Sequence, residues 1–279
     1  MVARLEQILA RLSEEAEAFL RIAPLALSEE TLVQRVSRAP SLLRRRSPAA
    51  PGQMPGLGFR TREIVSEYGY STFTDSPNVL HEIRQVISVD GKQVRKRDPG
   101  RLTLSLRAGS RDDRVKRRLL KEFEGFGLTS AAVDLGQIIL LFTRQRLADY
   151  EFEINGCGAL PPESALILEF RQISGYGSVT VFEGRNARRE TIQGELWARE
   201  SDGLPLRIAI HTLRGQEGHR LRNEATVDYA ISPHGALLPT SVTHREFLDD
   251  RLETESVCRY APFRRFSSES QIKFEEVKE

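Results

Sequence analysis

A strand, a polar turn and a second strand follow one another between residues 194 and 210, and this pattern constrains the fold most strongly. The turn at residues 200–203 ends in Asp202-Gly203, and glycine supplies the positive φ that a tight reversal needs. The second run has an apolar residue at every second position, which gives a strand one apolar face: Leu204, Leu206, Ile208 and Ile210. We predict a β-hairpin here, which also carries the only tryptophan, Trp197.

Runs of the same kind recur along most of the chain. They cover residues 30–36, 64–73, 80–89, 92–97, 150–154, 165–173, 178–182, 191–199, 221–231, 238–247 and 252–260, and Asp90-Gly91 marks a second tight turn. Short turns between neighbouring runs favour antiparallel pairing. We therefore expect a single α+β domain over residues 1–266, built on one large curved antiparallel sheet, and a polar tail over residues 267–279.

Three helices accompany the predicted sheet. Residues 2–22 have an apolar stripe at helical spacing, and Pro24 ends that helix. An insertion at residues 111–143 contains two more helices, 111–123 and 130–143, separated by Gly125 and Gly127. We expect the N-terminal helix and this helix pair to pack on the concave face of the sheet. Between the first two strands, residues 39–59 form a Pro-rich loop.

The sequence offers no motif for catalysis, a metal or a cofactor. The five histidines are scattered, without the spacing of a metal-binding motif. No GxSxG nucleophile motif occurs, and no glycine-rich loop opens a helix after a strand. Cys157 and Cys258 are about a hundred residues apart and form no CxxC pair. We expect two free thiols and a non-catalytic protein, with a disulfide between the two cysteines left open.

The segment that begins with Lys92 and ends with Lys121 is strongly basic, with twelve Lys and Arg residues against three Asp residues. Clusters of this kind bind nucleic acids or anionic lipids, or form a solvated face. Aromatic residues do not interleave with the charges, which argues against binding of single-stranded nucleic acid. We therefore predict no nucleic-acid partner, expect a solvated face, and keep contact with an anionic membrane surface as the alternative.

The predicted helix at 130–143 is apolar nearly all round, so it should be buried. One interpretation makes it the central core helix on the concave face of the sheet. The other makes it a lid over an apolar cavity that takes an acyl chain. The residues expected to line such a cavity come from this helix and from the hairpin: Leu135, Ile138, Ile139, Phe142, Leu196, Leu206 and Ile208.

The order of elements, together with Gly194-Glu-Leu-Trp197 and Asp202-Gly-Leu-Pro-Leu-Arg207, resembles the bacterial lipoprotein-carrier (lipoprotein-sorting) superfamily. The resemblance in sequence is confined to this hairpin, whereas the order of elements covers most of the chain. It implies an unclosed β-barrel covered by helices, a concave apolar surface that holds lipid, and no cofactor or turnover. The Pro-rich loop and the basic helix depart from the pattern of that superfamily.

These observations give two functional hypotheses. The first is non-catalytic binding or carriage of a lipid, a lipoprotein acyl chain or another apolar ligand in the bacterial cell envelope. The second is a structural or protein-interaction module with a self-filled core, which uses an edge strand or the basic face for a partner. No apolar run approaches the roughly 18 residues of a membrane-spanning helix. The expected compartment is the periplasm or envelope if a leader has been removed, and the cytoplasm if Met1 is the native start.

Overall fold

A computed structural model describes residues 2–37, 58–95, 113–128, 134–175, 179–183, 186–215 and 220–265. The predicted Pro-rich loop at 39–59 lies outside these residues except for its last two positions. The predicted polar tail at 267–279 lies wholly outside them. So does the middle of the basic segment, from residue 96 to residue 112.

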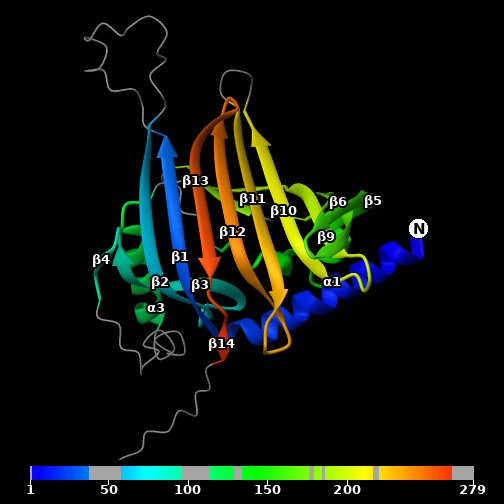
Figure 1. The fold of residues 1–279 in the computed structure, drawn as a ribbon, viewed down its shortest axis with the longest axis horizontal. Helices are drawn as coiled ribbons and strands as arrows, with labels where there is room; N and C mark the ends of the chain where they lie inside the picture. The colour runs from blue at the N-terminus through cyan, green and yellow to red at the C-terminus, as the bar shows by residue number, and fades with distance from the viewer. Residues whose placement is uncertain are drawn as a thin grey trace, which may run out of the picture.

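One large antiparallel sheet dominates the fold, and its strands run side by side in Figure 1. Its twelve strands lie in the order β4-β3-β2-β1-β13-β12-β11-β10-β9-β6-β5, with β14 pairing with β1, and the two end strands do not pair with each other. The predicted curved, unclosed antiparallel sheet is thus confirmed. The strands are β1 (Ala26–Ser37), β2 (Phe59–Phe73), β3 (Ser76–Val89), β4 (Lys92–Gln93), β5 (Tyr150–Leu160), β6 (Glu163–Gln172), β9 (Gln193–Arg199), β10 (Pro205–Arg214), β11 (Leu221–Ile231), β12 (Leu237–Leu248), β13 (Arg251–Tyr260) and β14 (Arg264–Arg265).

Two predicted turns have the geometry that their sequences require. Gly203 has a φ of 76° in the turn between β9 and β10, and Asp90 and Gly91 have φ values of 50° and 75° between β3 and β4. The predicted strand at 178–182 does not join the large sheet. It is β7 (Val179–Glu183), which pairs with β8 (Asn186–Glu190) in a separate two-stranded sheet that the sequence analysis did not predict.

The N-terminal helix is confirmed as α1 (Val2–Ile22), which runs along the lower end of the sheet in Figure 1. Ile8, Leu12, Ala16 and Phe19 of its apolar stripe are buried, and the Phe19 ring meets the Tyr70 ring of β2 edge to face at 5.3 Å between centroids. Pro24 lies in the short 3-10 turn η1 (Ala23–Leu25), and β1 follows at once. The helix is therefore fixed at the same end of the sheet at which β1 begins.

Only the first helix of the predicted pair forms. It is α3 (Asp113–Glu124), which packs beside β3, where its Leu119 lies in a small buried apolar cluster with Ile83 and Leu27. The predicted helix at 130–143 is wrong for the residues described. Asp134 has a positive φ of 63°, and the chain then forms only the 3-10 turn η3 (Ile138–Phe142), followed by η4 (Leu147–Asp149).

The reason for this difference lies in the hydrogen bonds. Polar side chains of the sheet bind the backbone N–H groups of Gly136 and Ile139, so these groups do not bond to carbonyls of a continuing α-helix. The apolar pattern correctly predicts that the segment is buried, but it does not determine the type of helix.

Candidate functional site

The inner wall of the sheet, the face that carries the main core, has a continuous apolar row. Residues that lie opposite one another on eight adjacent strands are at most 5% exposed. The row consists of Ile64, Leu32, Cys258, Val242, Val227, Ile208, Leu196 and Leu168. An apolar strip of this length is what an unclosed sheet needs in order to bury its concave face.

Toward the far end of β10, β11 and β12 the same wall becomes polar. The row next to the apolar row, two positions further along each strand, consists of Ile210, Ala225 and His244. The row after it contains Thr212 and Asn223. Burial lowers the pKa of His244 to about 4, so its ring is neutral at pH 7.

His244 Nδ1, Thr212 Oγ1 and Asn223 Oδ1 are all buried, and none has a hydrogen-bond partner among the protein groups described. Buried polar atoms are normally paired, so this end of the wall has unused hydrogen-bonding capacity.

The seven predicted cavity residues are brought together by the fold. Ile138, Ile139, Phe142, Leu196 and Ile208 are buried members of one apolar cluster, and Leu135 and Leu206 are partly buried against it. Phe142 also packs on the Phe170 ring of the inner wall, at 5.0 Å between centroids. Residues 134–142, which we call the covering segment, therefore lie on the inner wall in contact with α1. That the seven residues line a ligand cavity stays a prediction.

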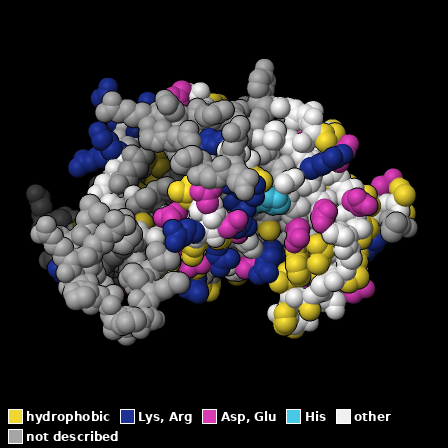
Figure 2. All heavy atoms as spheres, turned by 90° about the horizontal axis from the view of Figure 1, so that it is seen from above, with side chains coloured by type: hydrophobic (Ala, Val, Ile, Leu, Met, Phe, Trp, Pro, Cys, Tyr) yellow, Lys and Arg dark blue, Asp and Glu magenta, His cyan; other side chains and the backbone are white. Residues whose placement is uncertain are grey.

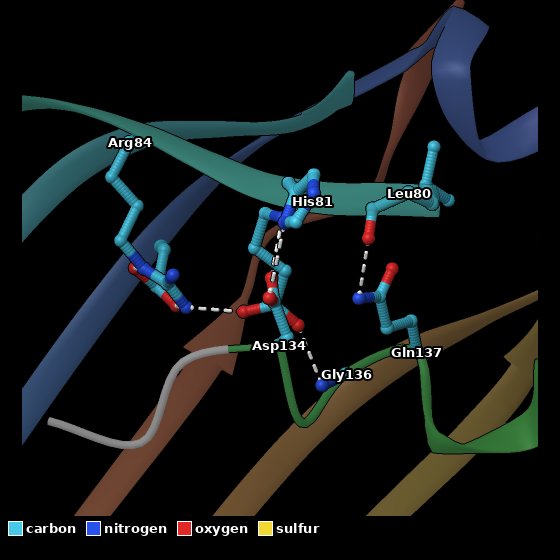
Figure 3. Close-up of polar contacts among 8 residues, drawn as sticks. Leu80, His81, Arg84, Asp134, Gly136 and Gln137 are labelled. Carbon is cyan, nitrogen blue, oxygen red and sulfur yellow. Dashed lines mark hydrogen bonds and ion pairs between the residues drawn. The ribbon is translucent and has the colours of Figure 1, made fainter. Parts of the chain in front are cut away.

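A set of polar contacts holds the start of the covering segment on β3, as Figure 3 shows. Gly136 N–H donates to Glu82 Oε1 at 2.6 Å, and Glu82 N–H donates to Asp134 Oδ1 at 2.8 Å. Gln137 Nε2 donates to the Leu80 carbonyl at 2.8 Å. We call these contacts, together with the Tyr229 contacts below, the polar clip.

Tyr229 of β11 completes the clip from the other side. Its hydroxyl accepts the Ile139 N–H at 3.2 Å and donates to the Gly136 carbonyl at 3.1 Å. One side chain thus satisfies a buried backbone donor and a buried backbone acceptor of the covering segment. Gly136 itself has no room for a side chain, because a Cβ there would lie 2.8 Å from Glu82 Oε1 and 2.9 Å from the Tyr68 hydroxyl.

Behind the clip lies a buried group of charges. The Arg84 guanidinium binds Glu30 through two bonds of 2.6 and 2.8 Å and donates a third bond of 2.7 Å to Glu82 Oε2. All three side chains are at most 2% exposed. Burial raises the pKa of Glu82 to about 7, opposed by Arg84 and reinforced by the carboxylates of Asp134 and Glu30. One arginine serves two carboxylates here, so Glu82 is the group whose charge is least compensated.

This charged group was not predicted, although the sequence contains a signal for it. Glu82 and Arg84 alternate with His81 and Ile83 in the predicted strand at 80–89, so they share a face with Leu80 and Val86. Charged residues at two successive positions on the apolar face of a strand indicate a buried ion pair. Their distant partner, Glu30, could not be identified without the sheet register.

A second feature lies on the outer face, opposite the main core. A groove of about 970 Å³ crosses β5, β6, β9, β10 and β11, and two polar rows line it. The first row is Glu151, Arg171, Gln193, His211 and Glu224, and the second is Glu153, Glu169, Glu195, Ala209 and Thr226. At Gly194, beneath the groove, a Cβ would lie 1.9 Å from the Ala209 carbonyl oxygen, so only glycine allows β9 and β10 to approach so closely.

Histidine, cysteine and carboxylate side chains are the groups that could serve acid–base or metal chemistry. His81 Nδ1 lies 3.4 Å from Asp134 Oδ2, but Asp134 is also part of the clip. Within the described ranges, no group of three His, Cys, Asp or Glu side chains could hold a metal ion. Both cysteines are free, as expected: Cys157 is exposed and Cys258 is buried.

The basic segment is only partly within the structure. Among its described members, Lys116 donates to the Thr72 carbonyl at 2.6 Å, Arg95 pairs with Glu122 at 2.7 Å, and Arg117 pairs with Asp75. These contacts occupy three of its charges within the molecule. In the view of Figure 2, hydrophobic side chains gather at the lower right, and charged side chains of both signs are interleaved near the centre. No helix in the described part of the chain is long and apolar enough to cross a membrane.

Comparison with known proteins finds only distant matches among solved structures. No family model and no curated protein matches the chain. A LolA superfamily protein from Nitrosomonas europaea shares 11% identity over 92% of this chain and 92% of that chain, with a TM-score of 0.33. A DUF1329 family protein from Desulfovibrio piger shares 11% identity over 92% and 91%, with a TM-score of 0.42. The lipoprotein LppX of Mycobacterium tuberculosis shares 10% identity over 92% and 94%, with a TM-score of 0.25.

All three TM-scores lie below 0.5, so the resemblance predicted from the hairpin and the order of elements stays a prediction. The identities are too low to transfer the role of any residue. The function is therefore argued from the inner wall and the covering segment alone.

Proposed function

We propose that the protein binds and carries an amphipathic lipid or other long apolar molecule between the inner wall and the covering segment. The observation that carries the proposal is the continuous apolar row across eight strands, covered by a segment whose only regular structure is the five-residue turn η3. The envelope as the site of action comes from the sequence resemblance. In this proposal the ligand takes the place of the covering segment, which acts as a lid.

The energetics of displacement favour a long chain. Four side chains of η3 are buried, namely Ile138, Ile139, Leu141 and Phe142. Exposing them costs about 1.5–3 kcal/mol each, or about 6–12 kcal/mol in total. Burying an acyl chain contributes about 0.8 kcal/mol per methylene, hence about 12 kcal/mol for a sixteen-carbon chain and about 6 kcal/mol for an eight-carbon chain. The longer chain offsets the cost over the whole of this range, whereas the shorter chain meets only its lower end.

The change from apolar to polar along the wall sets the orientation of the ligand. The apolar row accepts the chain, while unpaired polar atoms lie one row away at His244 and two rows away at Asn223 and Thr212. A polar head group that donates and accepts hydrogen bonds would satisfy them. The described part of this wall therefore favours an amphipathic ligand over a pure hydrocarbon.

A fluorescent fatty acid, 11-(dansylamino)undecanoic acid, tests the proposal when it is titrated into detergent-free protein. We expect saturable binding that palmitic acid displaces and octanoic acid does not. Tyr229→Phe removes both bonds of its hydroxyl to the covering segment, which destabilises the covered state by about 1–3 kcal/mol. The apparent affinity should then rise by about tenfold, because the open state is more populated.

Tyr260→Phe is the matched control. Its hydroxyl is also buried but has no partner in the described structure, so its removal should leave binding unchanged. Absence of saturable binding in the wild-type protein and in both variants would refute carriage.

The alternative remains a protein-interaction module with a self-filled core. Deep burial of the predicted cavity residues favours this alternative. Five of them are at most 5% exposed, as in an ordinary packed interior: Ile138, Ile139, Phe142, Leu196 and Ile208. This alternative predicts that no fatty acid binds and that Tyr229→Phe only destabilises the fold. The same titration, combined with urea unfolding of the variant, separates the two hypotheses.

A further inference from the structure

We infer that the free edge of β5, together with the outer-face groove beside it, is a docking surface for an extended polypeptide segment in which basic and apolar residues alternate. This surface is separate from the inner wall. It adds a protein partner to the proposed lipid carriage and does not depend on it.

The edge strand is long and unpartnered in the described structure. β5 pairs with β6 on one side, and no strand of the described chain pairs with its other side. The register is regular from Tyr150 to Ile154 and shifts between Ile154 and Cys157. The backbone groups of residues 151–154 are therefore the part that a further strand can pair with, since an open edge is a template for strand addition.

Side chains alternate along this edge. Glu151 and Glu153 are exposed and point to the outer face, whereas Phe152 and Ile154 are half-buried against the main core on the inner face. A strand added to β5 would place its own side chains beside these two sets in turn. The inner positions fit apolar residues, and the outer positions fit residues that complement carboxylates.

The groove extends this acidic character across the sheet. Its lining contains five glutamates, Glu151, Glu153, Glu169, Glu195 and Glu224, against one arginine, Arg171. Arg171 binds Glu151 at 2.8 Å, and Arg222, outside the lining, pairs with Glu224, so three glutamates have no arginine partner among these contacts. Trp197 Nε1 donates to Glu195 at 3.0 Å, and the Asn155 amide donates to Glu169. Both of these donors are neutral, so the two carboxylates keep their full charge.

Charge complementarity therefore selects a basic partner. Opposite charges on neighbouring strands contribute roughly 0.2–1 kcal/mol for each pair, and like charges are destabilising by similar amounts. A second copy pairing β5 with β5 would place glutamates beside glutamates, which argues against that occupant. Long lysine or arginine side chains could instead reach from the added strand toward Glu169 and Glu195 in the groove.

The test uses an eight-residue peptide of alternating lysine and valine, with blocked termini and a fluorescent label, in anisotropy titrations against the whole chain. We expect saturable binding that weakens at least tenfold between 50 and 300 mM NaCl. A peptide of alternating glutamate and valine should not bind. The lysine–valine peptide methylated on every backbone nitrogen keeps its charges but lacks all backbone donors, and it should not bind either.

The variant Glu151→Gln/Glu153→Gln should weaken binding about tenfold, whereas Glu63→Gln/Glu67→Gln, the same charge change on β2, should not. Fatty-acid binding should be unaffected by either variant, so failure of this inference and failure of lipid carriage are distinguishable. Undiminished binding of the methylated peptide would overturn strand addition. Equal binding of the acidic peptide would overturn charge selection. A dimer that sediments in ultracentrifugation and is broken by the peptide would assign the edge to a second copy instead.

Discussion

Replacing Glu82 by glutamine tests the buried charges behind the polar clip. In the wild-type protein Glu82 accepts a bond from Gly136 N–H through one oxygen and a bond from Arg84 through the other. Glutamine retains only one acceptor oxygen, so the bond lost relative to the charged carboxylate costs about 1–3 kcal/mol. The amide does not titrate, so the variant has no pH dependence from this position. The diagnostic effect is the change in pH dependence.

The sign follows from the raised pKa. Burial raises the pKa of Glu82 from 4.5 to about 7. Between these values the folded protein binds a proton that the unfolded chain has released, so the stability from this group falls as the pH rises. The stabilisation is fully present below pH 4.5 and is lost as the pH rises through 7. Each pH unit corresponds to about 1.4 kcal/mol, so the loss across this window is about 3 kcal/mol.

Urea unfolding of the wild-type protein and of Glu82→Gln at pH 5, 6, 7 and 8 measures this difference. The wild-type free energy of unfolding should fall relative to that of the variant by most of about 3 kcal/mol between pH 5 and 7, and then level off. Glu63→Gln, at an exposed position on β2, should run parallel to the wild-type protein. If the curves for Glu82→Gln and the wild-type protein are also parallel, the charge of Glu82 does not limit stability and the argument is refuted.

Three further predictions concern other parts of the fold. Gly194→Ala should destabilise by more than 3 kcal/mol, or prevent folding, because the added Cβ would lie 1.9 Å from the Ala209 carbonyl; urea unfolding checks this. Burial lowers the pKa of His244 to about 4, so its contribution to stability is present above pH 6.5 and lost as the pH falls toward 4. His244→Gln should remove that loss of about 3 kcal/mol, and an unchanged acid limb in the unfolding curves would contradict it. Iodoacetamide should modify Cys157 within minutes and leave Cys258 intact until the protein unfolds, as mass spectrometry of tryptic peptides can show, because Cys258 is buried and its pKa is raised by burial.

Local chemistry explains which parts of the fold could be predicted from the sequence. The hairpin at residues 194–210 combines a period of two with a glycine that needs a positive φ, and both signals act within a few residues. The same holds for the Asp90-Gly91 turn and for the apolar stripe of α1. Regular periodicity and turn chemistry were sufficient for these elements.

The covering segment could not be predicted in the same way. Its apolar residues predict burial, but its backbone conformation is set by Glu82 and Tyr229, which come from strands about 54 and 90 residues away. Such contacts exist only once the register of the sheet is known. The predicted cavity residues could be grouped from the sequence because the covering segment and the hairpin are both strongly apolar, and the fold places them in one cluster. The groove was missed because its charges lie on four strands, one or two on each.

Native mass spectrometry tests the central claim most directly. The protein, purified without detergent, is incubated with vesicles of palmitoyl-oleoyl phosphatidylethanolamine and phosphatidylglycerol, separated from them and measured intact. Carriage between the inner wall and the covering segment predicts a one-to-one adduct with the mass of a single phospholipid, more abundant in Tyr229→Phe than in Tyr260→Phe. A protein that keeps its unmodified mass in all three forms would contradict the account and favour the self-filled interaction module.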